Sequence, residues 1–189
     1  MVPIVVPEFF KYNSVLSIPL FALVALLLIR NAPNFSFSKH TVSKSVLFLD
    51  QSTHALIFRL NFLIKGLLDL GFVLYLLYFF KISLNSAPAL CLILSALLFG
   101  SLAYFVEGTH SIVHKIVTYS SGVLWALGQL YFGQLTGDAF FRHFTNIMVA
   151  IPIILAFGFM FAKKTNVIVQ ALCMAIWYIW LVVFVFNYL

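Results

Sequence analysis

Residues 56–80, LIFRLNFLIKGLLDLGFVLYLLYFF, decide the class of this fold. The stretch is long enough to cross a bilayer, because a helix needs about 20 mostly apolar residues to span roughly 30 Å of hydrocarbon. Yet it holds Lys65 and Asp69 near its middle, and a charged side chain at the bilayer centre costs about 2.5 to 3.5 kcal/mol on insertion scales. The sequence therefore predicts a membrane helix whose charged face is turned away from lipid, toward a bundle interior or a wet cavity.

The composition of the whole chain supports a membrane environment. Hydrophobic residues make up 63% of 189 positions, charged residues only 8%, and the mean hydropathy is +1.10. Six stretches are long and apolar enough to be helices that span a bilayer, and a barrel is excluded because the runs do not alternate apolar with polar residues. The predicted fold is all-α, a single-domain polytopic transmembrane bundle of six helices over residues 1–189, with spans at residues 12–29, 56–80, 87–106, 112–135, 144–162 and 167–188.

The connections between these spans are short except for one long polar loop, residues 30–55. Within it Val46 to Leu49 form an apolar patch, which we expect to lie along the membrane interface or to dip between helices. The net charge is +6, but the basic residues are spread one or two at a time between the spans, so the expected partners are membrane lipids and not nucleic acid. A homo-oligomer and a subunit of a larger membrane complex both stay open.

Polar residues in two spans are predicted to face each other across a pocket. In residues 59–72, RLNFLIKGLLDLGF, Lys65 and Asp69 are four apart and share one helix face, where they can neutralise each other. Helical spacing back from Lys65 reaches Asn61, one turn away, and then His54, two turns further, which gives one polar stripe. A second series of polar residues about one turn apart leads into the span at 112–135: His110, His114, Thr118 and Ser121.

The pair His110 and His114 also suggests a metal site. Two histidines at positions i and i+4 of a helix project side by side and can share a metal such as zinc, and Glu107, Asp50 or His54 could complete the ligand shell. A bound cation would lower the pKa of its water and supply a nucleophile for a lipid ester or amide. The alternative is that these residues lie among lipid headgroups at the interface.

The buried ion pair has two interpretations of its own. Asp69 beside Lys65, with His54 and His114 further along, has the elements of a proton relay, as in a small proton-coupled carrier. The pair is equally explained as a structural contact that holds the second span against its neighbours. Whether water reaches Asp69 would distinguish the two.

The order of these features resembles a known family. Its features are a polar first loop with FSFSKHTVSKS at 35–45, an Asn-Phe pair in the second span, and LLFGSLAYFVEGTHSIVHKI at 97–116. The chain is similar to the six-span bacterial and archaeal family catalogued as domain of unknown function nine-nine-eight, which is placed near the DRAM and Sfk-type membrane proteins. The positions that match the pattern are Ser36, Ser38, Ser43, Asn61, Phe62, His110 and His114.

The resemblance implies a link to lipid organisation and membrane trafficking, with no settled reaction. Lys39 and Lys44 stand where the family more often has an acid, which argues against a metal or acid-base role for the loop. The family pattern implies that the first loop is outside, whereas the distribution of Lys and Arg favours a cytoplasmic first loop. The leading expectation is a lipid-binding or lipid-organising protein, followed by a metal-dependent intramembrane hydrolase, a proton-coupled carrier and a structural subunit.

Overall fold

The computed structural model describes residues 6–30, 32–49, 52–106, 110–162 and 164–189, and these contain helices but no β-strand. Two short 3-10 helices accompany the longer ones, η1 at Glu8–Tyr12 and η2 at Ser43–Phe48. The all-α prediction is therefore confirmed. The α-helices are α1 (Asn13–Arg30), α2 (Ser52–Phe79), α3 (Ala87–Ser101), α4 (Ser111–Leu135), α5 (Ala139–Phe161) and α6 (Val167–Tyr188).

Two of the predicted spans have ends that differ from the helices by about five residues. The span at 87–106 ends early, at Ser101, where the serine hydroxyl donates to the carbonyl of Leu98 and a series of turns follows. The span at 144–162 begins late, because α5 already starts at Ala139. Its start is set by Asp138, whose carboxylate accepts from the main-chain N–H groups of residues 140 and 141.

Within the described residues, four helical segments are long and apolar enough to cross a membrane: Glu8–Arg30, Ser52–Phe79, Ala139–Phe161 and Val167–Tyr188. The helix α3 is apolar, but its 15 residues reach only about 22 Å at 1.5 Å per residue. The helix α4 has the length but carries more polar residues along it. The chain is thus a membrane protein. The predicted count of six spans is not confirmed, because four of the described helical segments qualify by length and hydropathy.

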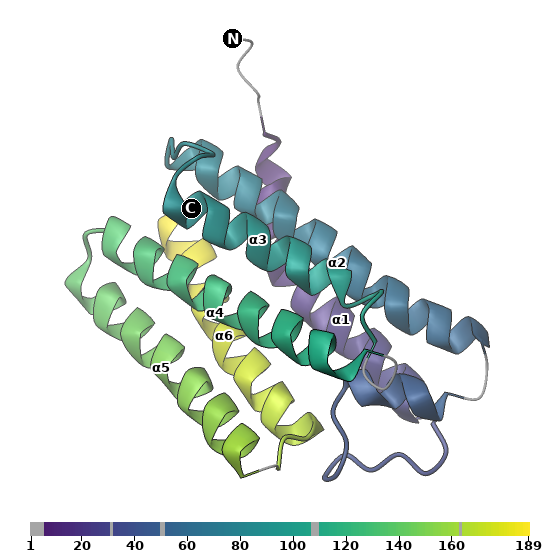
Figure 1. Ribbon diagram of the computed structural model, residues 1–189. Coiled ribbons are helices and arrows are strands. Elements are labelled where there is room, and N and C mark those ends of the chain that lie inside the picture. The colour runs from purple at the N-terminus through teal and green to yellow at the C-terminus, as the bar shows by residue number, and fades with distance from the viewer. Residues whose placement is uncertain (1–5, 31, 50–51, 107–109, 163) are drawn as a thin grey trace.

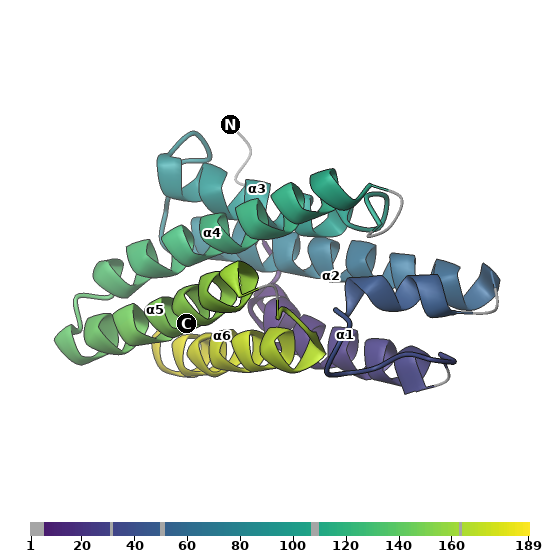
Figure 2. The same ribbon diagram turned by 60° about the horizontal axis from the view of Figure 1, so that its bottom comes forward.

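The six α-helices form a ring in chain order. Each helix packs against the next, and α6 returns to pack against α1 (Figures 1 and 2). Because successive helices are antiparallel, α1 begins and α6 ends at the same end of the bundle, which we call the terminal end. At the opposite end, the loop end, lie η2 and the connections between α3 and α4 and between α5 and α6.

Two hydrophobic clusters hold the ring together. The cluster near the terminal end joins all six α-helices, with the fully buried rings of Phe72, Phe132, Phe141, Trp180 and Phe184. The cluster near the loop end joins α1, η2, α2 and α4, and it includes Val46 at the start of the apolar patch. Val46 thus packs between helices, which agrees with the second of the two alternatives given for the apolar patch of the loop.

Candidate functional site

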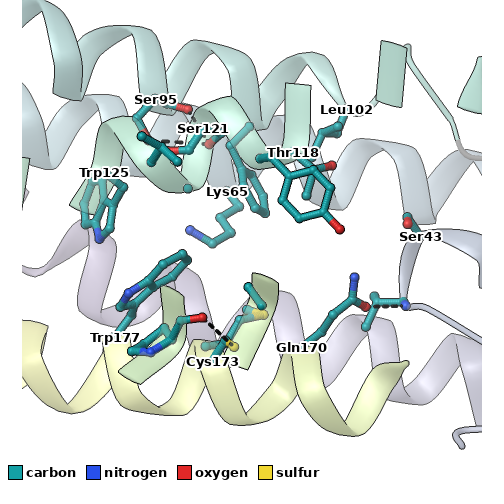
Figure 3. Close-up of a pocket in the computed structure, with 18 of the residues that line it drawn as sticks. Ser43, Lys65, Ser95, Leu102, Thr118, Ser121, Trp125, Gln170, Cys173 and Trp177 are labelled. Carbon is teal, nitrogen blue, oxygen red and sulfur yellow. Dashed lines mark hydrogen bonds between the residues drawn. The ribbon is translucent and has the colours of Figure 1, made fainter. Parts of the chain in front are cut away.

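A cavity of about 240 Å³ lies inside the ring of helices. An apolar cavity of about 150 Å³ accommodates a benzene ring, so this space has room for a substantial part of a small molecule. All six α-helices and the loop before η2 contribute to its walls. Figure 3 shows the lining side chains, which are mostly apolar or aromatic with a small number of polar groups among them.

The ion pair predicted in α2 lies at the wall of this cavity. The Lys65 ammonium donates to Oδ2 of Asp69, and both side chains are buried. The other carboxylate oxygen, Oδ1, accepts from the hydroxyls of Ser14 at 2.8 Å and Ser17 at 2.7 Å on α1. The carboxylate is therefore both neutralised and hydrogen-bonded, which is what a charge within a membrane bundle requires.

The Lys65 side chain extends from the ion pair into the cavity. Its ammonium lies 4.6 Å from the ring centroid of Phe99 on α3, where a cation–π contact adds to its stabilisation. Figure 3 shows its nitrogen pointing into the space lined by Trp125 and Trp177. The cavity thus has an inner end, formed by Lys65, Trp125 and Trp177 near mid-height of the bundle.

His114 lines the cavity and is held by hydrogen bonds to its neighbours. Its Nδ1 lies 2.7 Å from the main-chain oxygen of Phe105, and a carbonyl oxygen only accepts, so Nδ1 carries the proton. The other nitrogen, Nε2, is then an acceptor, 3.5 Å from Oγ1 of Thr118. The Thr118 hydroxyl itself donates to the carbonyl of His114 at 2.8 Å. The histidine is held in one tautomer by the turn that ends α3.

Two of the other predicted polar residues, Asn61 and Ser121, tie helices together, and a third, His54, does not. Asn61 is buried and donates to the main-chain oxygen of Phe21, at 2.9 Å, which joins α2 to α1. Ser121 lines the cavity and exchanges two hydrogen bonds with Ser95, since each hydroxyl donates to the carbonyl of the other residue. His54 is half-buried near the start of α2 and does not line the cavity.

The proposed metal ligands are not assembled by the residues that the structure describes. His110 precedes α4 and packs against the rings of Tyr104 and Phe105, and unlike His114 it does not line the cavity. No group of three His, Cys, Asp or Glu side chains that could hold a metal occurs among the described residues. Asp50 and Glu107, the acidic candidates, lie outside those residues.

The long loop covers the outer end of the cavity, at the loop end of the bundle. The main-chain N–H of Val42 donates to Oε1 of Gln170 at 2.7 Å, and Nδ2 of Asn166 donates to the carbonyl of Ser38 at 3.0 Å. The N–H of residue 167 donates to the carbonyl of His40. These bonds connect the loop to the start of α6, so the loop is held over the cavity rather than projecting from the bundle.

Several residues of the site were not anticipated from the sequence. Ser14 and Ser17 gave no signal, because serines in membrane helices commonly bond to their own helix. Gln170 and Trp177, about two turns apart on α6, both line the cavity, and this shared face is the one sequence pattern that points to them. Of the positions that carried the family resemblance, Ser43, Phe62 and His114 line the cavity.

A family model described as "Protein of unknown function (DUF998)" matches residues 15–187, which is nearly the whole chain. The chain belongs to the DUF998 family. The resemblance drawn from the first loop and the second to fourth helices is therefore confirmed, and the cavity lies within the DUF998 domain. The further link to DRAM and Sfk-type proteins stays a prediction. No curated protein and no solved structure matches the chain.

Proposed function

We propose that this DUF998 protein is a multi-pass membrane protein that binds a lipid in its central cavity and acts without a catalytic step. The observation that carries this proposal is the cavity itself, which has apolar walls inside a bundle of membrane helices. Ligand sites commonly combine such walls with a few convergent polar groups. Here the polar groups are Lys65, His114, Thr118 and Gln170.

The shape of the cavity supports a chain-like ligand. Its inner end is near mid-height of the bundle at Lys65, and its outer end reaches Val42 and Gln170 at the loop end. Toward the terminal end the buried aromatic cluster around Phe132 and Phe184 fills the bundle. A lipid chain entering from the loop end would thus meet apolar walls along its length and polar groups at both ends.

The proposal is tested by analysing lipids that stay with the protein during purification. Ala156 lies on the cavity wall, so Ala156→Phe would fill part of the space. Ala175 is exposed on α6, and Ala175→Phe adds the same ring outside the cavity. We expect lipid to be retained by the wild type and Ala175→Phe and to be lost from Ala156→Phe, as measured by native mass spectrometry. Equal retention by all three would contradict lipid binding in the cavity.

A proton-coupled carrier is the second candidate. It is favoured by the position of the ion pair at the wall of a cavity that reaches one end of the bundle. A carrier should bind its ligand in a pH-dependent manner, and Asp69→Asn should abolish that dependence. If the pair is structural, Asp69→Asn should lower the thermal stability and should not alter how ligand binding depends on pH.

A metal-dependent hydrolase acting on lipid is a third candidate, supported by the presence of His114, a potential metal ligand, in the cavity wall. Elemental analysis of the purified protein tests it directly. A hydrolase should contain about one zinc or similar ion per chain, which the double variant His110→Ala/His114→Ala should lose. Equal metal content in the two proteins would argue against this function. A subunit of a larger complex should instead be unstable when it is expressed alone.

A further inference from the structure

The charge inside the cavity is balanced before any ligand enters. Lys65 is the one Lys or Arg among the described residues that line the cavity, and Asp69 is the one acidic residue there. They pair with each other, so the described wall of the cavity has no net charge. A lipid phosphate would add one or two negative charges with no cation left to compensate them, and an uncompensated charge in an apolar interior is strongly disfavoured.

The two charges do not have the same access to the cavity. Both carboxylate oxygens of Asp69 already accept hydrogen bonds, one from Lys65 and the other from the hydroxyls of Ser14 and Ser17. The ammonium of Lys65 has three N–H groups, and among the described residues only Asp69 accepts from it. The positive end of a neutral pair therefore faces the cavity, and its remaining N–H groups can donate to a ligand.

A second donor belongs to another residue that lines the same cavity. The indole Nε1 of Trp177 is buried and has no hydrogen-bond partner among the described residues. Buried polar groups are nearly always paired, so an unpaired N–H on a cavity wall indicates an acceptor that comes from outside the protein. Lys65 and Trp177 come from α2 and α6, on different sides of the ring, and both line the same space.

From this arrangement, and given the lipid-binding function proposed above, we infer that the ligand is an uncharged lipid with carbonyl or hydroxyl oxygens. Such oxygens accept from Lys65 and from Trp177 at the inner end of the cavity. The aromatic rings of Phe99 and Trp125 surround this point, and the apolar remainder of the molecule follows the cavity toward the loop end. An acylglycerol has this chemistry, whereas a phospholipid headgroup does not.

Two probes with the same acyl chain test this inference. They are 1-oleoylglycerol, which is neutral, and 1-oleoyl-lysophosphatidic acid, which differs by its phosphate. Binding to the purified wild-type protein is measured with tritium-labelled lipid in a scintillation proximity assay. We expect 1-oleoylglycerol to bind at least about tenfold more tightly, and the cavity-filling variant Ala156→Phe to abolish its binding.

The donor role of Trp177 is tested by Trp177→Phe, which removes the N–H and keeps an aromatic ring. Loss of one hydrogen bond should weaken 1-oleoylglycerol binding about two- to tenfold. The control is Trp180→Phe, because the N–H of Trp180 donates to Thr145 at 2.8 Å, away from the cavity, and its loss should leave binding unchanged.

The outcomes separate this inference from the proposed function. Equal or tighter binding of the phosphate lipid would overturn the inference of a neutral ligand while lipid binding in the cavity stood. Failure of both lipids to bind, or binding that Ala156→Phe does not affect, would overturn lipid binding in the cavity and the inference with it. Unchanged affinity in Trp177→Phe would overturn the assignment of its N–H as a ligand donor.

Discussion

Gly66 of α2 and Gly100 of α3 meet backbone to backbone, but the contact is asymmetric. A Cβ atom added to Gly66 would lie 2.6 Å from Cα of Gly100 and 2.9 Å from the carbonyl oxygen of Ala96. A Cβ added to Gly100 would instead lie 3.6 Å from Cα of Gly66, which is ordinary van der Waals contact. Small residues at such crossings let membrane helices approach closely, and here the requirement for glycine falls on α2.

Gly66→Ala should therefore destabilise the protein, while Gly100→Ala should be tolerated. The added methyl group at position 66 collides with main-chain atoms, so α2 and α3 must separate, at a cost of about 1 to 3 kcal/mol. Thermal unfolding of the two variants in detergent gives the comparison. A loss of stability in Gly100→Ala equal to that in Gly66→Ala would contradict the asymmetry.

The Lys65–Asp69 pair should behave as a unit. Asp69→Leu leaves a buried ammonium without its partner, and breaking a buried ion pair in this way costs about 3 to 5 kcal/mol. In the double variant Lys65→Met/Asp69→Leu no charge is left uncompensated, so we expect it to recover much of that loss. Chemical or thermal unfolding of the single and double variants measures the difference. A double variant less stable than Asp69→Leu would show that the charges do more than neutralise each other.

Hydropathy and helical spacing were enough to predict the fold class and one face of α2. The end of α3 and the start of α5 were each misplaced by about five residues, because α3 ends at Ser101, whose hydroxyl bonds to the main chain, and α5 begins at the carboxylate cap of Asp138. Such local hydrogen bonds do not change the hydropathy of a segment. The pairing of Lys65 with Asp69 followed from spacing alone, since residues four apart share a helix face.

The rest of the candidate site depends on contacts between distant segments, which spacing does not report. Ser14 and Ser17 reach Asp69 across more than fifty residues of sequence, and Gln170 meets the loop at Val42. His110 and His114 are four residues apart, which would place them on one face of a helix. His110 lies before the first turn of α4, however, so the helical spacing does not apply to it. The cavity itself arises from the ring arrangement, which no single helix encodes.

The C-terminal end of α6 is tied to the start of α5 by a bond that depends on pH. The Tyr188 hydroxyl donates to Oδ2 of Asp138 at 2.6 Å, and this bond, together with the N–H groups of Phe140 and Phe141, lowers the pKa of the Asp138 carboxyl below its ordinary value of 3.8. A carboxyl with a lowered pKa in the folded state stabilises the protein fully above its unfolded value. That contribution is lost as the pH falls through the folded value.

Wild type should therefore be more stable than Tyr188→Phe at neutral pH, and the difference should shrink as the pH falls below about 4. Thermal unfolding at a series of pH values measures it. Asp138→Asn is the matched control, because asparagine keeps the helix cap but carries no charge, and its difference from wild type should also shrink at low pH. A difference between wild type and Tyr188→Phe that is constant with pH would contradict the assigned role.

The loop over the outer end of the cavity should open when its bonds to α6 are removed. Gln170→Ala removes the acceptor of the Val42 N–H, and Asn166→Ala removes the donor to the Ser38 carbonyl. Each bond contributes about 1 kcal/mol, so the open population should rise about fivefold per bond. Lys39 is exposed in this loop, and trypsin cleavage after it reports the open form, because proteolysis follows that population when reclosing is fast.

Asn187→Ala is the control, since the Asn187 amide is exposed and donates to the carbonyl of Val183 at the far end of α6. We expect cleavage after Lys39 to be fastest in the double variant Asn166→Ala/Gln170→Ala, intermediate in the single variants and unchanged in the control. The same double variant should exchange bound lipid faster than wild type, because the loop covers the outer end of the cavity. Faster cleavage with unchanged lipid exchange would mean that the ligand enters between the helices and not beneath the loop.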